Sequence, residues 1–284
     1  MQNLKQLTSL WTNKLFNLYS EREVRNILLL VLEDIFGFNR SALLVSKEIA
    51  LSDDQLNQLD QISSRLQTGE PVQYLIGFTY FDDLKIEVAP GVLIPRPETE
   101  ELVSWIMESA REHTNLKVED WCTGSGCIAL AIKNRRRDFE IFGLDVSEEA
   151  LLIARSNARK LNLNIEFEFG NALDIDERKS VDLIVSNPPY IPWIEKEQMH
   201  MNVTGFEPDL ALFVPDEDPL LFYRAIAEYA VQHLNNGGYL FFELHENYSL
   251  ETKAMVESLG FDPVEVRKDL QGKERMLKAK WTVR

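Results

Sequence analysis

Residues 120–126 read Asp120-Trp121-Cys122-Thr123-Gly124-Ser125-Gly126, at the end of a strand-like run and directly before a helical pattern. Small residues at such a turn let the backbone approach a ligand, and the N-terminus of the next helix offers unpaired N–H groups. With Ala129, the turn matches the glycine/alanine variant of the dinucleotide-binding fingerprint. A tight strand-to-helix turn would use the same residues without a ligand, so the turn alone does not decide.

Two further strand-like runs end in residues that suit an adenosine group. Asp145 follows Gly126 by 19 residues, where a carboxylate can accept hydrogen bonds from both ribose hydroxyls. Asp145 could instead cap a helix that begins near Ser147. Phe169 and Asn171 end the third run and could contact an adenine, although core packing and a plain turn explain them equally well. Together these features predict an adenosine-containing cofactor.

The sequence around this region alternates between strand-like and helical patterns. Strand-like runs occupy residues 117–121, 141–144, 165–169, 181–185 and 239–244. Helical or loop segments separate them, as a parallel sheet with crossover helices requires. We therefore expect an α/β, Rossmann-like, doubly wound domain over residues 96–284.

The preceding residues have a different pattern. Apolar residues recur at three- and four-residue spacing through residues 1–70, and Ser52 with Gln55 predicts the capped start of a third helix. This predicts a small all-α N-terminal domain, without plausible catalytic groups, that recognises the substrate. Residues 71–95 mix aromatic residues with Gly and Asp, which indicates a hairpin-like linker.

Composition narrows the classes of function. The 284 residues carry a formal net charge of -16, whereas a protein that binds duplex nucleic acid normally offers a basic face. We therefore expect no direct nucleic-acid contact. Cys122 and Cys127 have no second pair at zinc-like spacing, so we expect free thiols and no metal. The sequence shows neither a signal-peptide core nor a membrane-spanning run, so we expect a soluble, cytoplasmic protein.

The run at residues 181–186 reads as a buried strand, and it delivers Asn187-Pro188-Pro189-Tyr190 at its carboxyl end, where open α/β sheets bind ligands. The prolines fix the backbone and remove two N–H donors. The Asn187 oxygen and a neighbouring carbonyl can then accept the hydrogens of one planar NH₂ group, while Tyr190 offers a ring face. Holding the NH₂ in this way counteracts the delocalisation that makes an amide nitrogen a poor nucleophile. The motif predicts an N-methyltransferase, although a rigid turn would contain the same prolines.

The order of these motifs resembles class I methyltransferases that act on planar nitrogens. Flanking segments at residues 69–77, 93–100, 206–208 and 222–224 are similar to the HemK/PrmC family, the glutamine N5-methyltransferases of peptide chain release factors. The likeness covers essentially the whole chain. It implies methyl transfer from S-adenosyl-L-methionine to a release-factor glutamine in translation termination.

The resemblance also implies roles for individual positions. The cofactor would contact the residues Cys122, Thr123, Gly124, Ser125, Gly126, Asp145, Phe169, Asn171 and Asn187. Catalysis would fall to Asn187, Pro188 and Tyr190, which would hold the substrate glutamine together with Pro189. Arg96 and Glu98 lie in a motif of the family, but they could equally be an exposed base and a first-turn acid.

This sequence departs from the family pattern at three places. Cys122 stands where glycine is common, Asn171 where an acidic residue is frequent, and Val214-Pro215 where glycines are usual. These differences put in question the cofactor turn, the adenine contact and the role of the loop between Glu207 and Phe222.

Three other functions compete with this interpretation. A DNA adenine-N6 methyltransferase uses a related motif on a flipped base, but the acidic charge argues against it. A glutamine methyltransferase of a ribosomal protein would have the same reacting group, so catalytic residues do not separate it. A nicotinamide-dependent oxidoreductase, or a module that only binds a cofactor, would leave Asn187-Pro188-Pro189-Tyr190 without a role.

Overall fold

The computed structural model describes residues 3–45, 48–174 and 178–282. The chain forms two compact units. Unit 1 comprises residues 1–77 together with His200–Phe206, and unit 2 comprises the remainder. Each unit buries hydrophobic residues of its own, in one cluster in unit 1 and two clusters in unit 2.

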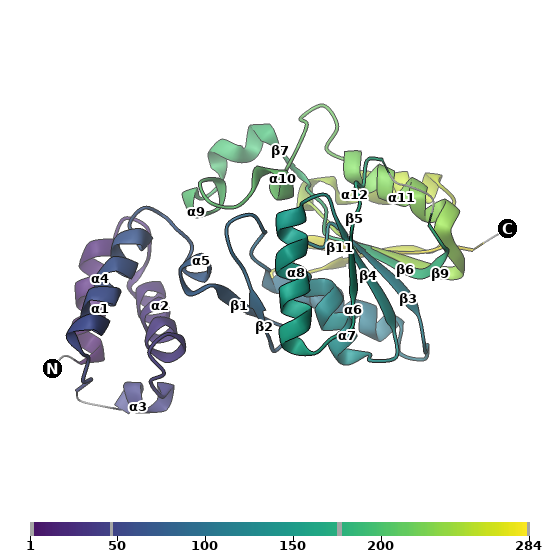
Figure 1. Cartoon of the computed structure of the whole chain (residues 1–284). Helices are drawn as coiled ribbons and strands as arrows, with labels where there is room; N and C mark the ends of the chain where they lie inside the picture. The colour runs from purple at the N-terminus through teal and green to yellow at the C-terminus, as the bar shows by residue number, and fades with distance from the viewer. Residues whose placement is uncertain (1–2, 46–47, 175–177, 283–284) are drawn as a thin grey trace. The chain divides into compact units, whose positions relative to one another are not determined.

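Unit 1 is helical (Figure 1). Its helices are α1 (Leu4–Leu15), α2 (Glu21–Asp34), α3 (Arg40–Val45), α4 (Asp53–Leu66), α5 (Val72–Ile76) and α9 (Met201–Thr204). Capping boxes at Asn3, Ser20 and Ser52 begin α1, α2 and α4, so the predicted start of the third long helix is confirmed. The segment His200–Phe206 belongs to unit 1, and within it the Asn202 amide donates a 2.7 Å hydrogen bond to the Tyr19 hydroxyl.

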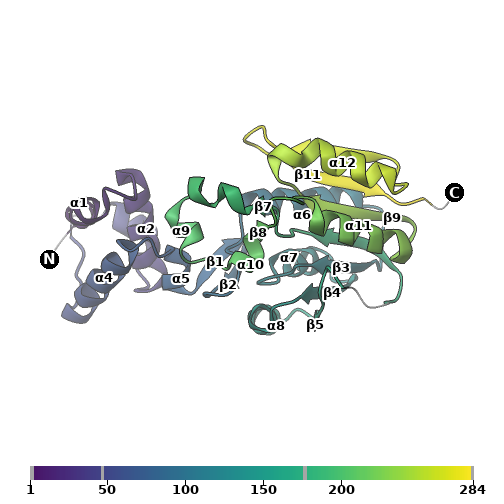
Figure 2. The same ribbon diagram turned by 90° about the horizontal axis from the view of Figure 1, so that it is seen from above.

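Unit 2 is built on a seven-stranded sheet. Its strands are β3 (Lys117–Trp121), β4 (Glu140–Asp145), β5 (Glu166–Phe169), β6 (Val181–Ser186), β9 (Leu234–Glu243), β10 (Val264–Lys268) and β11 (Glu274–Lys280). Their order is β10-β11-β9-β6-β3-β4-β5. In Figure 2 the labelled strands β11, β9, β3, β4 and β5 follow this order from top to bottom. The strands β9, β6, β3, β4 and β5 are parallel, and β11 and β10 extend the sheet antiparallel.

Helices cover both faces of this sheet (Figure 1). Helices α6 (Pro97–Ser109), α7 (Cys127–Arg135) and α8 (Glu148–Leu161) share one hydrophobic cluster with Leu183 and Val185 of β6. Helices α11 (Leu221–His233) and α12 (Ser249–Ser258) share the other cluster with Ile184. Successive strand residues point to opposite faces, so one strand supplies both clusters. The predicted doubly wound α/β fold with a small helical N-terminal region is confirmed.

Short elements connect these parts of unit 2. They are β1 (Phe78–Phe81), β2 (Leu84–Glu87), β7 (Ile191–Pro192), η1 (Trp193–Gln198), α10 (Asp209–Leu212), β8 (Phe213–Val214) and η2 (Glu246–Tyr248). Strands β1 and β2 form an antiparallel hairpin inside the segment expected to be hairpin-like, but residues 72–76 of that segment are helical. No helix among the described residues is long and apolar enough to cross a membrane.

The sheet differs from the prediction at one edge. We expected parallel strands only, and β10 and β11 were not predicted. Strand β10 alternates apolar and charged residues over Val264-Glu265-Val266-Arg267, and β11 does so over Leu277-Lys278-Ala279-Lys280. This pattern is typical of antiparallel strands rather than of the continuous apolar runs of a parallel sheet. The structure therefore has a mixed sheet with its parallel part in the middle.

Candidate active site

The carboxyl ends of four parallel strands meet at one edge of the sheet. Trp121 of β3 pairs with Leu144 of β4 and with Ser186 of β6. Ser186 in turn pairs with Phe242 of β9. The residues that follow each strand therefore gather at the same edge, where ligands bind in open α/β sheets.

A cavity of about 250 Å³ opens at this edge. Six of the predicted site residues line it: Cys122, Gly124, Asp145, Asn171, Asn187 and Pro189. Apolar or small residues complete much of the wall, among them Val92, Leu93, Val146, Ala150, Gly170, Ala172 and Phe222. A cavity with apolar walls and a few convergent polar groups is the usual form of a small-molecule site.

The other predicted residues do not line the cavity. Thr123, Ser125 and Gly126 lie in the glycine turn but are not part of the cavity wall, and neither are Pro188 and Tyr190. Phe169 is 55% exposed at the end of β5, so it belongs to neither core cluster, and Val146 occupies the wall instead. The Asn171 side chain accepts a 3.0 Å hydrogen bond from the Leu173 N–H, so it stabilises a turn while also lining the cavity.

Backbone geometry explains the residue types of the turn. Gly124 and Gly126 have φ angles of +55° and +81°, a region that favours glycine. A Cβ on Gly126 would lie 3.0 Å from the Phe167 ring, whereas one on Gly124 would meet nothing within 4 Å. Gly126 is thus needed for packing of α7, and Gly124 leaves open space beside the cavity. Cys122 also has a positive φ of 59° and lines the cavity, and its side chain packs against the core cluster that contains Ile184.

Asp145 joins the glycine turn to the end of β4. Its carboxylate accepts hydrogen bonds from the Gly124 N–H at 2.8 Å and from the Ser147 N–H at 2.9 Å. Ser147, not Asp145, is the N-cap of α8, since its hydroxyl accepts from the Ala150 N–H. Burial raises the pKa of Asp145, and the hydrogen bonds from these N–H groups partly counteract that rise. The capping alternative therefore does not account for this carboxylate, which lines the cavity.

Asp120 is a buried carboxylate beneath the turn that sequence reasoning did not single out. One of its oxygens accepts from the Thr123 hydroxyl at 2.6 Å and from the Ala129 N–H at 3.1 Å. Burial raises the pKa of Asp120 to about 7. Its other oxygen, and the Ser125 hydroxyl, have no hydrogen-bond partner among the described residues. Asp120 thus fixes the turn from below, and unpaired polar atoms lie under the part of the turn expected to hold a cofactor.

The Asn187–Tyr190 motif is held by contacts to neighbouring strands. Before it, the Ser186 hydroxyl donates a 2.7 Å hydrogen bond to the Trp121 carbonyl. Within it, the Tyr190 N–H donates to the Leu212 carbonyl at 3.3 Å. After it, the two-residue strand β7 pairs with β8, in which Val214 is fully buried. The loop that departs from the family pattern at Val214 therefore supports the segment that follows the motif.

Two further residues contact the motif and were not predicted. Thr99 of α6 and Glu243 of β9 are 1% and 2% exposed. The Thr99 hydroxyl donates to Glu243 Oε2 at 2.6 Å, and the Tyr190 hydroxyl donates to Glu243 Oε1 at 3.2 Å. The Asn187 amide nitrogen donates to Thr99 Oγ1 at 3.5 Å. A carboxylate at the end of the apolar run Leu240–Phe242 was the one sequence signal that could have identified Glu243.

The segment before α6 is fixed by an ion pair. Arg96 pairs with Glu207, whose side chain is 1% exposed and also accepts a 3.0 Å hydrogen bond from the Ile94 N–H. Glu207 adjoins Pro208 in the cavity wall, and Ile94 adjoins Leu93 on another part of it. The Arg96–Glu207 ion pair and the Ile94–Glu207 hydrogen bond therefore hold these two parts of the cavity wall next to each other. Glu98 has a different contact, because it accepts a 2.8 Å hydrogen bond from the Gln271 amide.

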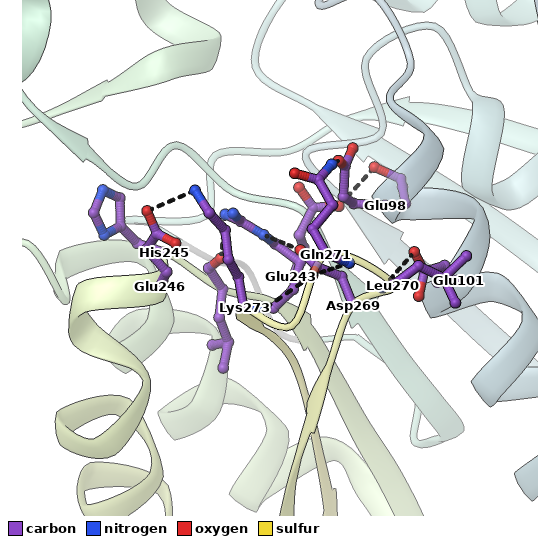
Figure 3. Close-up of polar contacts among 12 residues, drawn as sticks. Glu98, Glu101, Glu243, His245, Glu246, Asp269, Leu270, Gln271 and Lys273 are labelled. Atoms are coloured by element: carbon purple, nitrogen blue, oxygen red, sulfur yellow. Dashed lines mark hydrogen bonds and ion pairs between the residues drawn. The ribbon is translucent and has the colours of Figure 1, made fainter. Parts of the chain in front are cut away.

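The turn between β10 and β11 contacts Glu101 of α6 and Glu246 (Figure 3). In this turn the Leu270 N–H donates to Glu101 of α6 at 3.2 Å, and Lys273 pairs with Glu246 at 3.0 Å. Asp269 accepts hydrogen bonds from within the turn. The antiparallel edge that was absent from the predicted sheet thus closes one side of the region around Glu243.

Two protein families match the sequence. The family described as the PrmC N-terminal domain matches residues 6–77, and the Methyltransferase small domain matches residues 99–204. A release factor glutamine methyltransferase of Bacteroides thetaiotaomicron is 41% identical over 278 residues, covering 97% of this chain and 99% of the relative. One of Flavobacterium psychrophilum is 38% identical, with 97% and 98% covered.

A solved structure agrees with the fold. The crystal structure of a methyltransferase from Pyrococcus furiosus matches with a TM-score of 0.53 at 20% identity, covering 70% of this chain and 90% of that one. At this level of identity the match establishes the architecture of the sheet and its helices alone.

Proposed function

The chain belongs to the family of release factor glutamine methyltransferases, and on that premise we propose that it transfers a methyl group from S-adenosylmethionine to the N5 nitrogen of a glutamine in a peptide chain release factor. One observation supports this function above the others. Asn187 and Pro189, from the motif suited to a planar nitrogen, line the same cavity as Gly124 and Asp145, from the part suited to an adenosine-containing cofactor.

The cavity residues fit the proposed cofactor. Gly124 leaves its side of the cavity free of side chains, Asp145 presents a carboxylate suited to ribose hydroxyls, and Val146 and Ala172 form an apolar wall for a base. The unpaired oxygen of Asp120 and the Ser125 hydroxyl lie beneath the same turn. When bound, S-adenosylmethionine would supply a methyl group on a positively charged sulfur.

The motif residues would bind and orient the glutamine. The Asn187 side-chain oxygen and a backbone carbonyl of the adjacent prolines would accept the two hydrogens of the substrate NH₂ group, which concentrates electron density on its nitrogen. The aromatic ring of Tyr190, next in the motif, is held by its hydroxyl on Glu243. The motif residues would therefore contribute positioning and fixed dipoles, and the proton that the substrate nitrogen loses on methylation would pass to water.

The decisive test is methylation of a defined substrate. We expect the purified chain, with methyl-labelled S-adenosylmethionine, to label a release factor on one glutamine, identified by mass spectrometry of its peptides. A release factor in which that glutamine is replaced by alanine should remain unlabelled. Parallel reactions should contain ribosomal proteins and adenine-bearing duplex DNA. Labelling of either of those substrates without labelling of release factors would reject this assignment, and the net charge of -16 argues against the DNA.

A further inference from the structure

We propose that Glu243 and Thr99 are positioning residues that fix which end of the Asn187 side-chain amide faces the substrate. This inference rests on the proposed function, since it assigns the groups that hold Asn187 ready for that reaction. Neither residue lines the cavity. Both would act through Asn187 without touching substrate or cofactor.

The contacts form a chain that begins at a buried carboxylate. Glu243 Oε2 accepts the Thr99 hydroxyl proton at 2.6 Å. Thr99 Oγ1 lies 3.5 Å from Asn187 Nδ2. Because Thr99 has given its only proton to Glu243, its oxygen can only accept from a third group. The end of the amide that faces Thr99 must therefore be the NH₂ group.

This constraint sets the opposite end of the amide. With Nδ2 directed to Thr99, the Asn187 oxygen is left as the acceptor on the cavity side. A side-chain amide has nearly the same shape when turned by 180° about χ2, so packing alone selects poorly between its two orientations. The wrong orientation would present N–H donors to the substrate NH₂, which is itself a donor. The hydroxyl–carboxylate pair thus selects the orientation that the proposed chemistry needs.

Glu243 is itself firmly held. Its Oε1 accepts from the Tyr190 hydroxyl at 3.2 Å, so one carboxylate contacts two positions of the motif, directly or through Thr99. Its backbone carbonyl accepts from the Tyr223 hydroxyl at 3.0 Å. Burial raises the pKa of Glu243, and attraction to the Arg275 guanidinium counteracts part of that rise. Figure 3 shows Glu243 among the residues of the Asp269–Lys273 turn, with Glu98 and Glu101 on one side and His245 and Glu246 on the other.

The kinetic test uses isosteric variants of Thr99. Thr99→Val keeps the shape but removes the hydroxyl, and we expect the single-turnover rate of release-factor methylation to fall on the order of ten-fold, with cofactor affinity unchanged. Thr99→Ser restores the hydroxyl and should restore the rate to within a few-fold. Thr252→Val is the matched control, because Thr252 is a fully buried threonine of α12 that donates to the Tyr248 carbonyl. It should lower thermal stability without changing the rate.

A double variant separates positioning from general destabilisation. If Thr99 acts through Asn187, adding Thr99→Val to Asn187→Ala should lower the rate further by a factor of roughly two or less, because the group that Thr99 orients is already absent. A purely structural effect would multiply the two losses. Multiplied losses, or a wild-type rate in Thr99→Val while Asn187→Ala is inactive, would overturn the positioning role but leave the proposed function intact.

A spectroscopic measurement keeps the inference testable without any substrate. The side-chain NH₂ resonances of Asn187 can be assigned by their loss in Asn187→Ala. Thr99→Val and Glu243→Gln should both shift these resonances, whereas Thr252→Val should not. Unchanged Asn187 resonances in both Thr99→Val and Glu243→Gln would refute the positioning role of Thr99 and Glu243. Failure of the wild-type chain to methylate any release factor would instead refute the proposed function, and the resonances would still test the positioning role.

Discussion

At the scale of single residues, Asn187 has two ends with different tasks. Its nitrogen contacts Thr99, and its oxygen is the proposed acceptor for the substrate. We expect Asn187→Ala to fold normally and to lose on the order of 10²–10³ in turnover, as when one fixed polar contact is removed from an active site. Cofactor affinity should change far less, because Gly124 and Asp145 carry the proposed cofactor contacts. Single-turnover methyl transfer to a release factor at saturating cofactor measures both effects.

The Asn187→Asp variant sharpens this test. It keeps an acceptor but adds a negative charge, and its second oxygen can no longer donate to Thr99. We expect cofactor binding to persist and the rate to lie between those of wild type and Asn187→Ala. A wild-type rate in both variants would mean that the motif is only a rigid turn.

Asp145 combines structure and binding in one carboxylate. We expect Asp145→Ala to weaken S-adenosylmethionine binding by about 1.5–3 kcal/mol for each charge-assisted hydrogen bond that is lost to ribose. The structure adds a second cost, because Gly124 and Ser147 both donate to this carboxylate. Asp145→Asn is the matched comparison, since it keeps one oxygen for an N–H donor and should weaken binding less. Equal calorimetric affinities for both variants and wild type would return Asp145 to a structural role.

Asp120 makes stability depend on pH in a defined window. Burial disfavours the charged form and raises the pKa of Asp120 to about 7 in the native state, from the value of 3.8 for an exposed aspartate as in the unfolded chain. Between these values the native state binds more protons than the unfolded state, so the free energy of unfolding falls as pH rises. One such group contributes a slope of up to about 1.4 kcal/mol per pH unit.

The Asp120→Asn variant isolates this contribution. Its amide does not titrate, so its free energy of unfolding in urea should decline less steeply than that of wild type between pH 4 and 7. Glu119, Asp145 and Glu243 also have pKa values raised by burial, and all three are present in both proteins. Parallel pH profiles for the two proteins would show that Asp120 is not the responsible group.

At the scale of elements, the turn from β3 to α7 depends on close packing against α8 and β5. A Cβ on Gly126 would lie 3.0 Å from Phe167 and 3.1 Å from Ala154, at a φ of +81°. A non-glycine residue held at positive φ lowers the free energy of unfolding by roughly 1–3 kcal/mol. Gly126→Ala should lower it by more, because the added Cβ also meets these neighbours. Gly237→Ala is the control, because Gly237 has a φ of +86° but nothing within 4 Å of the added Cβ. Urea denaturation should rank Gly126→Ala as the less stable variant, and equal losses would show that the neighbours yield without cost.

The elements differ in how far sequence reasoning could reach. The bounds predicted for β3, β4, β5 and β6 agree with the structure to within one residue at either end, although only β4 and β6 contain an apolar run and β3 and β5 alternate charged with apolar residues. The helix at residues 72–76 was not, because a five-residue helix carries too few turns for a periodic signal. The edge strands β10 and β11 are rich in charged residues and contain no run of more than two apolar residues.

At the scale of the whole molecule, the site residues that could be predicted from the sequence are those near the carboxyl ends of strands. Gly124, Asp145 and Asn187 lie at or within three residues of the carboxyl ends of β3, β4 and β6, and parallel strands bring such positions together. Thr99 and Glu207 could not be placed in the same way, because their partners lie 144 and 111 residues away in the sequence. Such pairings depend on the packing of α6 and of the loop between α9 and α10, which no local sequence pattern predicts.

Cofactor binding and recognition of the protein substrate are proposed to belong to different units. All the described residues that line the cavity belong to unit 2, so a chain that begins at Phe78 should bind S-adenosylmethionine with nearly full-length affinity. Unit 1 is proposed to recognise the protein substrate, so the shortened chain should methylate an intact release factor poorly while retaining activity on a short glutamine peptide. Because His200–Phe206 packs within unit 1, replacing Tyr19 by Phe in the full-length chain provides a milder comparison that removes the 2.7 Å hydrogen bond to Asn202. The ratio of the rates on the intact factor and the peptide is the informative quantity, since a loss of fold would lower both rates together. If the shortened chain keeps the full-length ratio, recognition must lie in unit 2, and the exposed Trp193 and Ile194 beside the motif would be the first residues to replace.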